Sequence, residues 1–251
     1  MPYKFSKEQV DQTIIDIELE SLEGADLTGI IFSTLELNGI NLNAIDYNGC
    51  VNYKGSINLS GINIDGGASF IGANLIGANL KKATLNKQKG YNVVFTHAKL
   101  IGANLSEVSS RWGYFVHADF RGASLYQSDF CFSCFRNAIF TKVDFRFSNL
   151  QRCNFNYSDL SKCRLSGSFL PNSKFKGANM KGADLYSANL TSADFRTANL
   201  SGAILAGADL TNANFSLANL EGADLRGAKL DGAKFKGTDL YGCIFDEPAL
   251  R

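Results

Sequence analysis

The sequence predicts an all-β solenoid, in which the chain winds into successive coils with five-residue sides. The first observation is a large apolar residue at every fifth position, here called position i, from Phe70 to Leu250 except at Gly90 and Ser110. The second is a small residue at position i−2, most often alanine, and the third is an Asn or Asp at many i−1 positions. A helix repeats every 3.6 residues and a strand every 2, so a period of five fits neither.

A five-residue period indicates that each unit forms one side of a coil. The large residue at i and the small residue at i−2 then both point to the coil axis, where space is short. Successive coils are expected to stack through backbone hydrogen bonds at ~4.8 Å, the usual distance between neighbouring strands. Side chains one full coil apart therefore form columns along the axis.

Three units carry a resemblance to a known family. The segments Ala-Asn-Leu-Ile-Gly at 73–77, Ala-Asp-Leu-Tyr-Ser at 183–187 and Ala-Asp-Leu-Arg-Gly at 223–227 resemble the A(D/N)LXX unit of the pentapeptide-repeat family. The resemblance covers residues 22–250. It implies a right-handed quadrilateral β-helix with four faces and 20 residues per coil, and hence nine coils between positions 70 and 250.

The chain is predicted to form one elongated domain. Residues 1–21 form an N-terminal cap that is partly helical, because Ser6 begins a Ser-x-x-Gln capping box that predicts a helix around 6–13. Such a helix would cover the edge of the first coil, and a partner-binding helix is the alternative. Residues 22–250 form the pentapeptide-repeat β-helix.

Two regions break the period. Between 48 and 69 several steps are six residues long instead of five, with glycines nearby, which predicts local bulges. At Gly90 and Ser110, which are 20 residues apart, the large apolar residue is missing. This predicts neighbouring distorted sides at 86–93 and 106–113 that bulge outward. The alternative is that a nearby large side chain folds in to fill the gap: Tyr91, Val94 or Trp112.

Large aromatic side chains at outward positions predict an interaction surface. Trp112, Phe132 and Arg152 are spaced by 20 and should form a column, in which a guanidinium over a ring is attractive by ~0.5–1 kcal/mol. Exposed aromatic residues are typical of protein interfaces. The alternative is local packing at the coil corners. The candidate partner-binding residues of region 86–157 are Tyr91, Trp112, Tyr126, Phe132, Phe147, Arg152 and Tyr157.

The net charge of +1 is unevenly spread along the chain. Residues 1–66 hold 3 basic and 10 acidic residues, residues 67–181 hold 16 and 5, and residues 182–251 hold 6 and 9. Such a banded rod can steer partners by its field. The simpler interpretation is that outward positions of a solenoid tolerate charge of either sign.

Catalytic and metal-binding patterns are not found. The sequence has no serine nucleophile elbow, phosphate-binding loop or metal-ligand cluster, and the two histidines, His97 and His117, are 20 apart and should lie near 5 Å from one another. Two imidazoles alone are too few ligands for a structural metal. We therefore expect no enzyme activity, no cofactor and no metal.

The sequence favours a cytoplasmic protein. It has no run of 18 apolar residues and no apolar signal-peptide core, and its six cysteines are scattered, three of them (Cys153, Cys163 and Cys243) at the small inward position. These features predict no membrane segment and a reducing compartment. A secreted effector without a cleavable signal is the alternative.

The first functional hypothesis is a non-catalytic protein–protein interaction scaffold that binds a partner through the basic, aromatic region 86–157. The resemblance also implies two alternatives, a DNA-mimicking protein that protects a topoisomerase such as gyrase and a substrate- or host-binding domain of a bacterial effector. Mimicry of DNA requires a strongly negative rod, which the basic central band argues against. Direct nucleic-acid binding is not favoured, because the termini are acidic and no continuous basic run exists. The C-terminal coil could pair with a second copy to form a homodimer.

Overall fold

The computed structural model describes residues 31–32, 35–36, 63–64, 68–69 and 95–246. Two parallel pairs lie in the first part, β1 (Ile31–Phe32) with β3 (Asn63–Ile64) and β2 (Leu35–Glu36) with β4 (Ala68–Ser69). Their partners are 32 and 33 residues apart, so the 20-residue register does not hold for these strands. The predicted cap at 1–21, most of the irregular segment 48–69, and segment 86–93 with Tyr91 lie outside the described residues.

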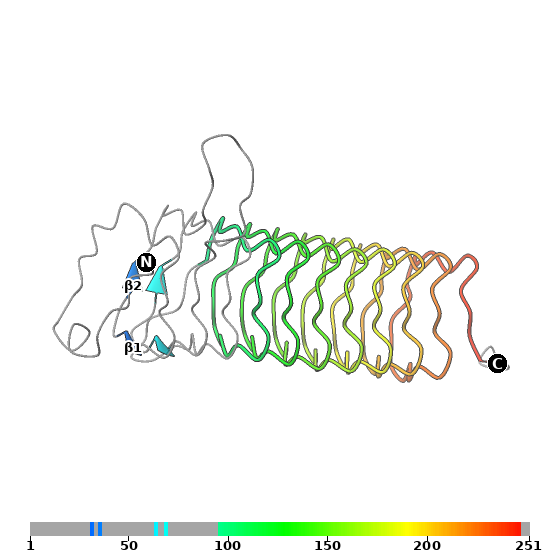
Figure 1. Ribbon diagram of the computed structural model, residues 1–251. Helices are drawn as coiled ribbons and strands as arrows, with labels where there is room; N and C mark the ends of the chain where they lie inside the picture. Colours follow the sequence, from blue (N-terminus) through cyan, green and yellow to red (C-terminus); the bar gives the residue numbers. More distant parts are fainter. Residues whose placement is uncertain (1–30, 33–34, 37–62, 65–67, 70–94, 247–251) are drawn as a thin grey trace.

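From 95 to 246 the chain winds into stacked coils of similar shape (Figure 1). Each residue at i−1 forms a parallel bridge to the residue 20 positions later, from Lys99 with Asp119 to Asp224 with Ile244. Since sides are five residues long, a register of 20 gives four sides per coil, and the predicted four-sided coil is confirmed. No helix within the described ranges is long and apolar enough to cross a bilayer.

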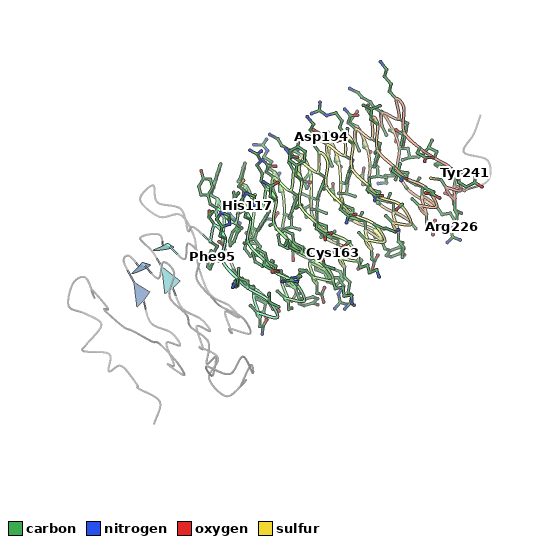
Figure 2. All side chains as sticks on the ribbon, turned by 90° about the horizontal axis from the view of Figure 1, so that it is seen from above. Phe95, His117, Cys163, Asp194, Arg226 and Tyr241 are labelled. Carbon is green, nitrogen blue, oxygen red and sulfur yellow. The ribbon has the colours of Figure 1, made fainter. Side chains whose placement is uncertain are left out.

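The four sides form four walls, which are named here by their residues at position i. Wall A begins at Leu100, wall B at Leu105, wall C at Ser110 and wall D at Phe95, and each wall continues in steps of 20. Residues at i+1 and i+2 form the corner that leads to the next wall. Figure 2 shows the side chains of the described coils from above, with the successive coils side by side.

The unit Ala183–Ser187 shows why the repeat has its composition. Its five backbone N–H groups each have an acceptor, and only the one at i+1 needs a side chain, the carboxylate at i−1. This explains the preference for Asp or Asn at i−1, because a buried or crowded N–H without a partner is costly. The donors and acceptors are Ala183 to the Met180 carbonyl (3.0 Å), Asp184 to Cys163 (2.8 Å), Leu185 to Ile204 (2.7 Å), Ser187 to Ala206 (3.0 Å) and Tyr186 to Oδ1 of Asp184 (3.0 Å).

The interior is filled by the residues at i and i−2, which are buried along most of the described coils. Cys153 and Cys163 are fully buried at i−2, as predicted, and their thiols donate to the carbonyl oxygens of Phe130 and Phe140. Position i of wall D is phenylalanine in every described coil, with neighbouring ring centroids 4.8–5.3 Å apart. The ladder consists of Phe95, Phe115, Phe135, Phe155, Phe175, Phe195, Phe215 and Phe235.

Residues 106–113 do not bulge outward, in contrast to the sequence-based expectation. Ser109 and Tyr114 keep the regular bridges to residues 20 positions later, and Ser110 is fully buried. Between residues 95 and 243, the turn at Ser110–Gly113 alone lacks its backbone hydrogen bond between the first and fourth residue. The irregularity is therefore confined to one turn.

A hydroxyl group from the next coil replaces that hydrogen bond. The Gly113 N–H donates to Ser133 Oγ at 2.9 Å, and Ser133 Oγ donates to the Ser110 carbonyl oxygen at 2.8 Å. A Cβ on Gly113 would lie 2.4 Å from the Phe115 ring, so that ring occupies the space beside the small Ser110. Trp112 does not fill this space: it is 46% exposed and therefore lies on the outer surface.

Candidate functional site

An aromatic ridge lies on the corner between walls C and D, formed by Trp112, Phe132 and Arg152. The rings of Trp112 and Phe132 stack with centroids 4.1 Å apart and an interplanar angle of 3°. The guanidinium carbon of Arg152 lies 5.4 Å from the centroid of Phe132. The column predicted from the 20-residue spacing is confirmed, and Phe132 is covered on both ring faces.

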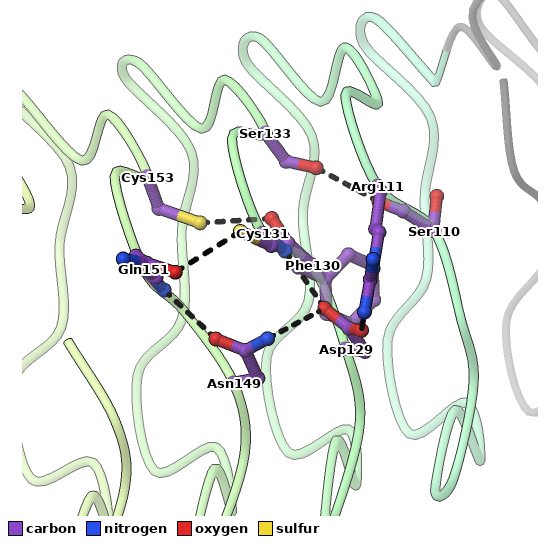
Figure 3. A network of polar contacts seen from close by, with 9 residues as sticks. All are labelled: Ser110, Arg111, Asp129, Phe130, Cys131, Ser133, Asn149, Gln151 and Cys153. Atoms are coloured by element: carbon purple, nitrogen blue, oxygen red, sulfur yellow. Dashed lines mark hydrogen bonds and ion pairs between the residues drawn. The ribbon is translucent and has the colours of Figure 1, made fainter.

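A polar network links neighbouring coils on wall C and at this corner (Figure 3). The Asp129 carboxylate accepts from Nε of Arg111 at 2.7 Å, from the Cys131 N–H at 3.1 Å and from Nδ2 of Asn149 at 3.1 Å. The hydrogen bond to Asp129 raises the pKa of Arg111 above its ordinary value. Residues from three coils are thereby tied together next to the ridge.

A second aromatic cluster lies on the corner between walls B and C. Tyr126 and Phe147 meet edge to face at 5.9 Å, and Arg146 lies 5.5 Å from the Tyr126 centroid. The ring of Phe147 leans over the next coil, where a Cβ on Gly167 would be 2.6 Å from it. Phe147 and Arg152 are five residues apart, so the ridge and this cluster flank the two sides of wall C.

Tyr157 is not part of either group. It lies on the corner between walls D and A, in the column of His97, His117 and Asn137. The two imidazoles stack with centroids 4.8 Å apart, as predicted, and Nδ2 of Asn137 lies 3.5 Å from Nε2 of His117. The Tyr157 ring covers Gly177 in the following coil. Of the candidate residues, the structure thus brings Trp112, Phe132 and Arg152 together, pairs Tyr126 with Phe147, and separates Tyr157.

Five of the candidate residues occupy a strained backbone position. Every residue at i+2 from 97 to 242 has φ between 52° and 69°. This left-handed region costs roughly 1–2 kcal/mol for residues other than glycine. From 97 to 162, 12 of 14 such positions are not glycine, whereas from 202 to 242 seven of nine are glycine. Trp112, Phe132, Phe147, Arg152 and Tyr157 all have this conformation.

Two exposed aromatic residues at position i−1 were missed by the sequence reasoning. Tyr114 on wall D is 46% exposed, and Phe169 on wall C is 43% exposed. Both stand at i−1, where the repeat prefers Asn or Asp, and so a scan for aromatic residues at that position would have found them. They extend the aromatic surface from the corners onto the two walls that meet at the ridge.

The arrangement offers binding groups but no reactive group that is both activated and accessible. Cys131, behind the ridge, is 5% exposed, and burial raises the pKa of its thiol. Within residues 95–246 and the four short strands, no three His, Cys, Asp or Glu side chains gather into a set that could hold a metal ion. What the ridge and its neighbours present is ring edges and cationic groups.

Comparison with protein families decides the membership of this chain. Eight copies of the family model described as "Pentapeptide repeats" match residues 58–106 and 114–246, which is more than half of the chain. The chain belongs to the pentapeptide-repeat family. As a pentapeptide-repeat protein it has the right-handed quadrilateral β-helix predicted from the resemblance. The comparison with curated proteins gave no match.

Several solved structures resemble this pentapeptide-repeat protein. HetL, from the cyanobacterium Nostoc sp. strain PCC 7120 and involved in heterocyst differentiation regulation, is 26% identical over 91% of this chain and 92% of its own, with a TM-score of 0.44. QnrB1, a plasmid-mediated fluoroquinolone resistance protein, is 20% identical over 86% and 93%, with a TM-score of 0.32. Rfr23 from Cyanothece 51142 is 32% identical over 41% and 64%, with a TM-score of 0.23.

Proposed function

We propose that this pentapeptide-repeat protein is a non-catalytic scaffold that binds a protein partner through the aromatic ridge of Trp112, Phe132 and Arg152. The observation that supports this most directly is the backbone strain. Bulky side chains stand at left-handed positions where glycine serves the same turn in the C-terminal coils. Strain of this kind is common at functional sites, because selection for binding can offset a loss of stability.

The shape and chemistry of the ridge suit a protein partner. Stacking along the axis holds Trp112 and Phe132 in place, so little side-chain entropy remains to be lost on binding. Trp, Tyr and Arg are the residues most often found at the energetic centre of protein interfaces. Tyr126 and Phe147 stand on the opposite side of wall C, and they extend the contact surface across that wall.

Topoisomerase protection by DNA mimicry is less well supported. It requires a strongly negative rod, and residues 95–246 carry 17 Lys and Arg against 13 Asp and Glu. The ridge itself contributes a guanidinium. A gyrase supercoiling assay with a quinolone present tests the alternative directly, because a protective protein restores supercoiling at drug concentrations that otherwise abolish it.

Affinity capture with matched variants tests the scaffold. Immobilised wild-type protein is compared with Trp112→Ala and Phe132→Ala in lysate of the source organism, and captured proteins are quantified by mass spectrometry. Leu217→Ala is the control, because Leu217 is 67% exposed and has φ 61° but lies on the corner between walls D and A. We expect a partner lost about tenfold or more with the ridge variants and retained with the control. Equal capture by all four proteins would refute the ridge as the binding site.

A second copy is a further candidate partner, at the C-terminal coil. The N–H groups of Phe235 and Leu240 have no acceptor among the described residues, whereas the equivalent groups in earlier coils donate to the next coil. Tyr241 is 79% exposed beside them. Such edges pair readily with other chains. Light scattering after size exclusion tests this, with Leu240→Lys and Tyr241→Lys expected to convert a dimer to a monomer, and a wild-type monomer at all concentrations would disprove it.

A further inference from the structure

The outer surface of wall D, with the corner that follows it, is strongly basic. Six cations stand there at positions i−1 and i+1, against a single acidic residue, Asp194, which is paired with Arg196 at 2.7 Å. The other surfaces of residues 95–246 carry 11 cations and 12 acidic residues. We call this surface the basic wall, and its cations are Arg136, Lys174, Lys176, Arg196, Lys234 and Lys236.

The cations of the basic wall are mostly uncompensated. Lys174, Lys176, Lys234 and Lys236 form no ion pair within the described chain, whereas Arg111, Arg121, Arg146, Arg164 and Arg226 elsewhere each contact an aspartate. The N–H of Lys176 donates to Oδ1 of Asn156 at 2.9 Å, so the backbone beneath this lysine is satisfied by a neutral side chain. The surface therefore holds an excess of positive charge, with six cations against one acidic residue.

The basic wall extends along the coil axis over successive coils. The phenylalanine ladder lines its inner side along its whole length, with ring spacings of 4.8–5.3 Å. The pair Lys174 and Lys176 lies three coils from the pair Lys234 and Lys236, which is roughly 14 Å at the spacing of neighbouring strands. The aromatic ridge borders the same wall at its other corner, and ring edges carry partial positive charge. The wall and the ridge edges thus have the same electrostatic sign.

We propose that the basic wall binds an acidic segment of a protein partner, placed along the coil axis beside the ridge. This inference rests on the proposed function, because it names the chemistry of the partner that the ridge would hold. Carboxylates on one face of a helix or strand can reach cation rows roughly 10–14 Å apart, since residues rise by ~1.5 Å in a helix and ~3.3 Å in a strand.

Two observations favour an acidic protein over a nucleic acid. Two coils of the wall carry no cation, one with Asn154 and Asn156 and one with Asn214 and Ser216. Such gaps do not match duplex DNA, which carries one phosphate per ~1.7 Å of axis. Binding of single strands depends on open ring faces on which bases stack. Both faces of Phe132 are already covered, by Trp112 and by Arg152.

A charge-reversal experiment tests the inference. Fluorescence anisotropy measures the binding of a labelled 20-residue poly-glutamate peptide to the full chain at low and at physiological salt. The variant carries Lys174→Glu and Lys176→Glu. The control carries Lys142→Glu and Lys162→Glu, two exposed lysines on the corner between walls A and B. We expect Kd to rise about tenfold for the basic-wall variant and about twofold or less for the control.

Each other outcome has a defined meaning. No binding of the peptide by the wild-type protein at low salt, or equal weakening in both variants, would overturn the inference. Tighter binding of a 20-nucleotide single strand or a 20-base-pair duplex than of the peptide would assign the wall to nucleic acid instead. Circular dichroism of both variants confirms that the fold is intact.

The failure of this inference can be distinguished from failure of the proposed function. If the peptide does not bind but Trp112→Ala still abolishes partner capture, the ridge is supported as the binding site and the basic wall is refuted. If the peptide binds through Lys174 and Lys176 but ridge variants capture the partner normally, the ridge is wrong and the wall stands.

Discussion

The hydroxyl of Ser133 donates to the carbonyl oxygen of Ser110 at 2.8 Å, and both residues are buried. The same hydroxyl accepts the Gly113 N–H at 2.9 Å, so it bridges the one turn between residues 95 and 243 that lacks its own backbone hydrogen bond. A side chain of one coil thus completes the backbone of the coil before it. This relationship gives the first testable prediction.

Ser133→Ala should destabilise the protein by about 2 kcal/mol, because it leaves a buried N–H and a buried carbonyl oxygen without a partner. The control is Ser173→Ala. Ser173 donates its hydroxyl to the Leu170 carbonyl at 2.6 Å, and the Ser173 N–H already satisfies that oxygen at 3.2 Å. Its loss should cost less than about 1 kcal/mol. Thermal unfolding compares the two variants, and equal losses would contradict the bridging role.

Gly202→Ala should destabilise the fold by about 1 kcal/mol through the backbone alone. Gly202 has φ 64°, and a Cβ built on it meets nothing within 4 Å, so no clash contributes. Gly202→Asn should cost less, because Asn adopts the left-handed conformation more readily than other residues. Urea denaturation of both variants measures the difference. If Asn is as harmful as Ala, the turn does not require a positive φ at this position.

Pro171→Ala should destabilise the chain by about 1 kcal/mol, because it adds an N–H with no acceptor. Pro171 stands at i+1, and Phe169 at i−1 offers no side-chain oxygen to that position. In most units an Asn or Asp at i−1 accepts this N–H, as Asp184 does for Tyr186. The double variant Phe169→Asn, Pro171→Ala should therefore recover the stability. Failure of the second substitution to rescue the first, measured by thermal unfolding, would disprove this account.

Acid should destabilise the coils through their arginine-paired aspartates. The hydrogen bond from Arg196 holds the pKa of Asp194 below its ordinary value of 3.8, although burial opposes the effect. Because the folded pKa is lowered, this stabilisation is complete above pH 3.8 and is lost as the pH falls through the folded value. Asp144 and Asp224 have lowered pKa values with arginine partners of the same kind.

The variant Asp194→Asn isolates one of these pairs. Asn keeps an Oδ1 acceptor for the Arg196 N–H but cannot ionise, so the loss at pH 7 should be below about 1 kcal/mol for a half-exposed ion pair. Melting temperatures between pH 7 and pH 2 should fall less steeply for this variant than for the wild type. Parallel pH profiles would show that the ion pair does not contribute to acid sensitivity.

Much of the candidate site followed from counting residues. The positions of Trp112, Phe132 and Arg152 in one column, and of His97 above His117, are consequences of a 20-residue coil, and the structure agrees. The basic wall was missed for a related reason. Charge counted in consecutive blocks of sequence averages over all four walls, whereas the cations gather at positions of one wall that recur every 20 residues.

The sequence by itself determined the coil and the inward or outward direction of each residue in the regular repeats. It did so because the backbone imposes a single five-residue period, and nearly all units between residues 95 and 243 form the same backbone hydrogen bonds. Only the tertiary structure decided which side chains contact one another between coils. The ring of Phe115 lies beside Ser110, and the ring of Phe147 lies over Gly167. The hydroxyl of Ser133 donates to a turn of the preceding coil. These contacts depend on the space between a side chain and the next coil. That space is set by the size and rotamer of the neighbouring side chains, which the five-residue period does not specify.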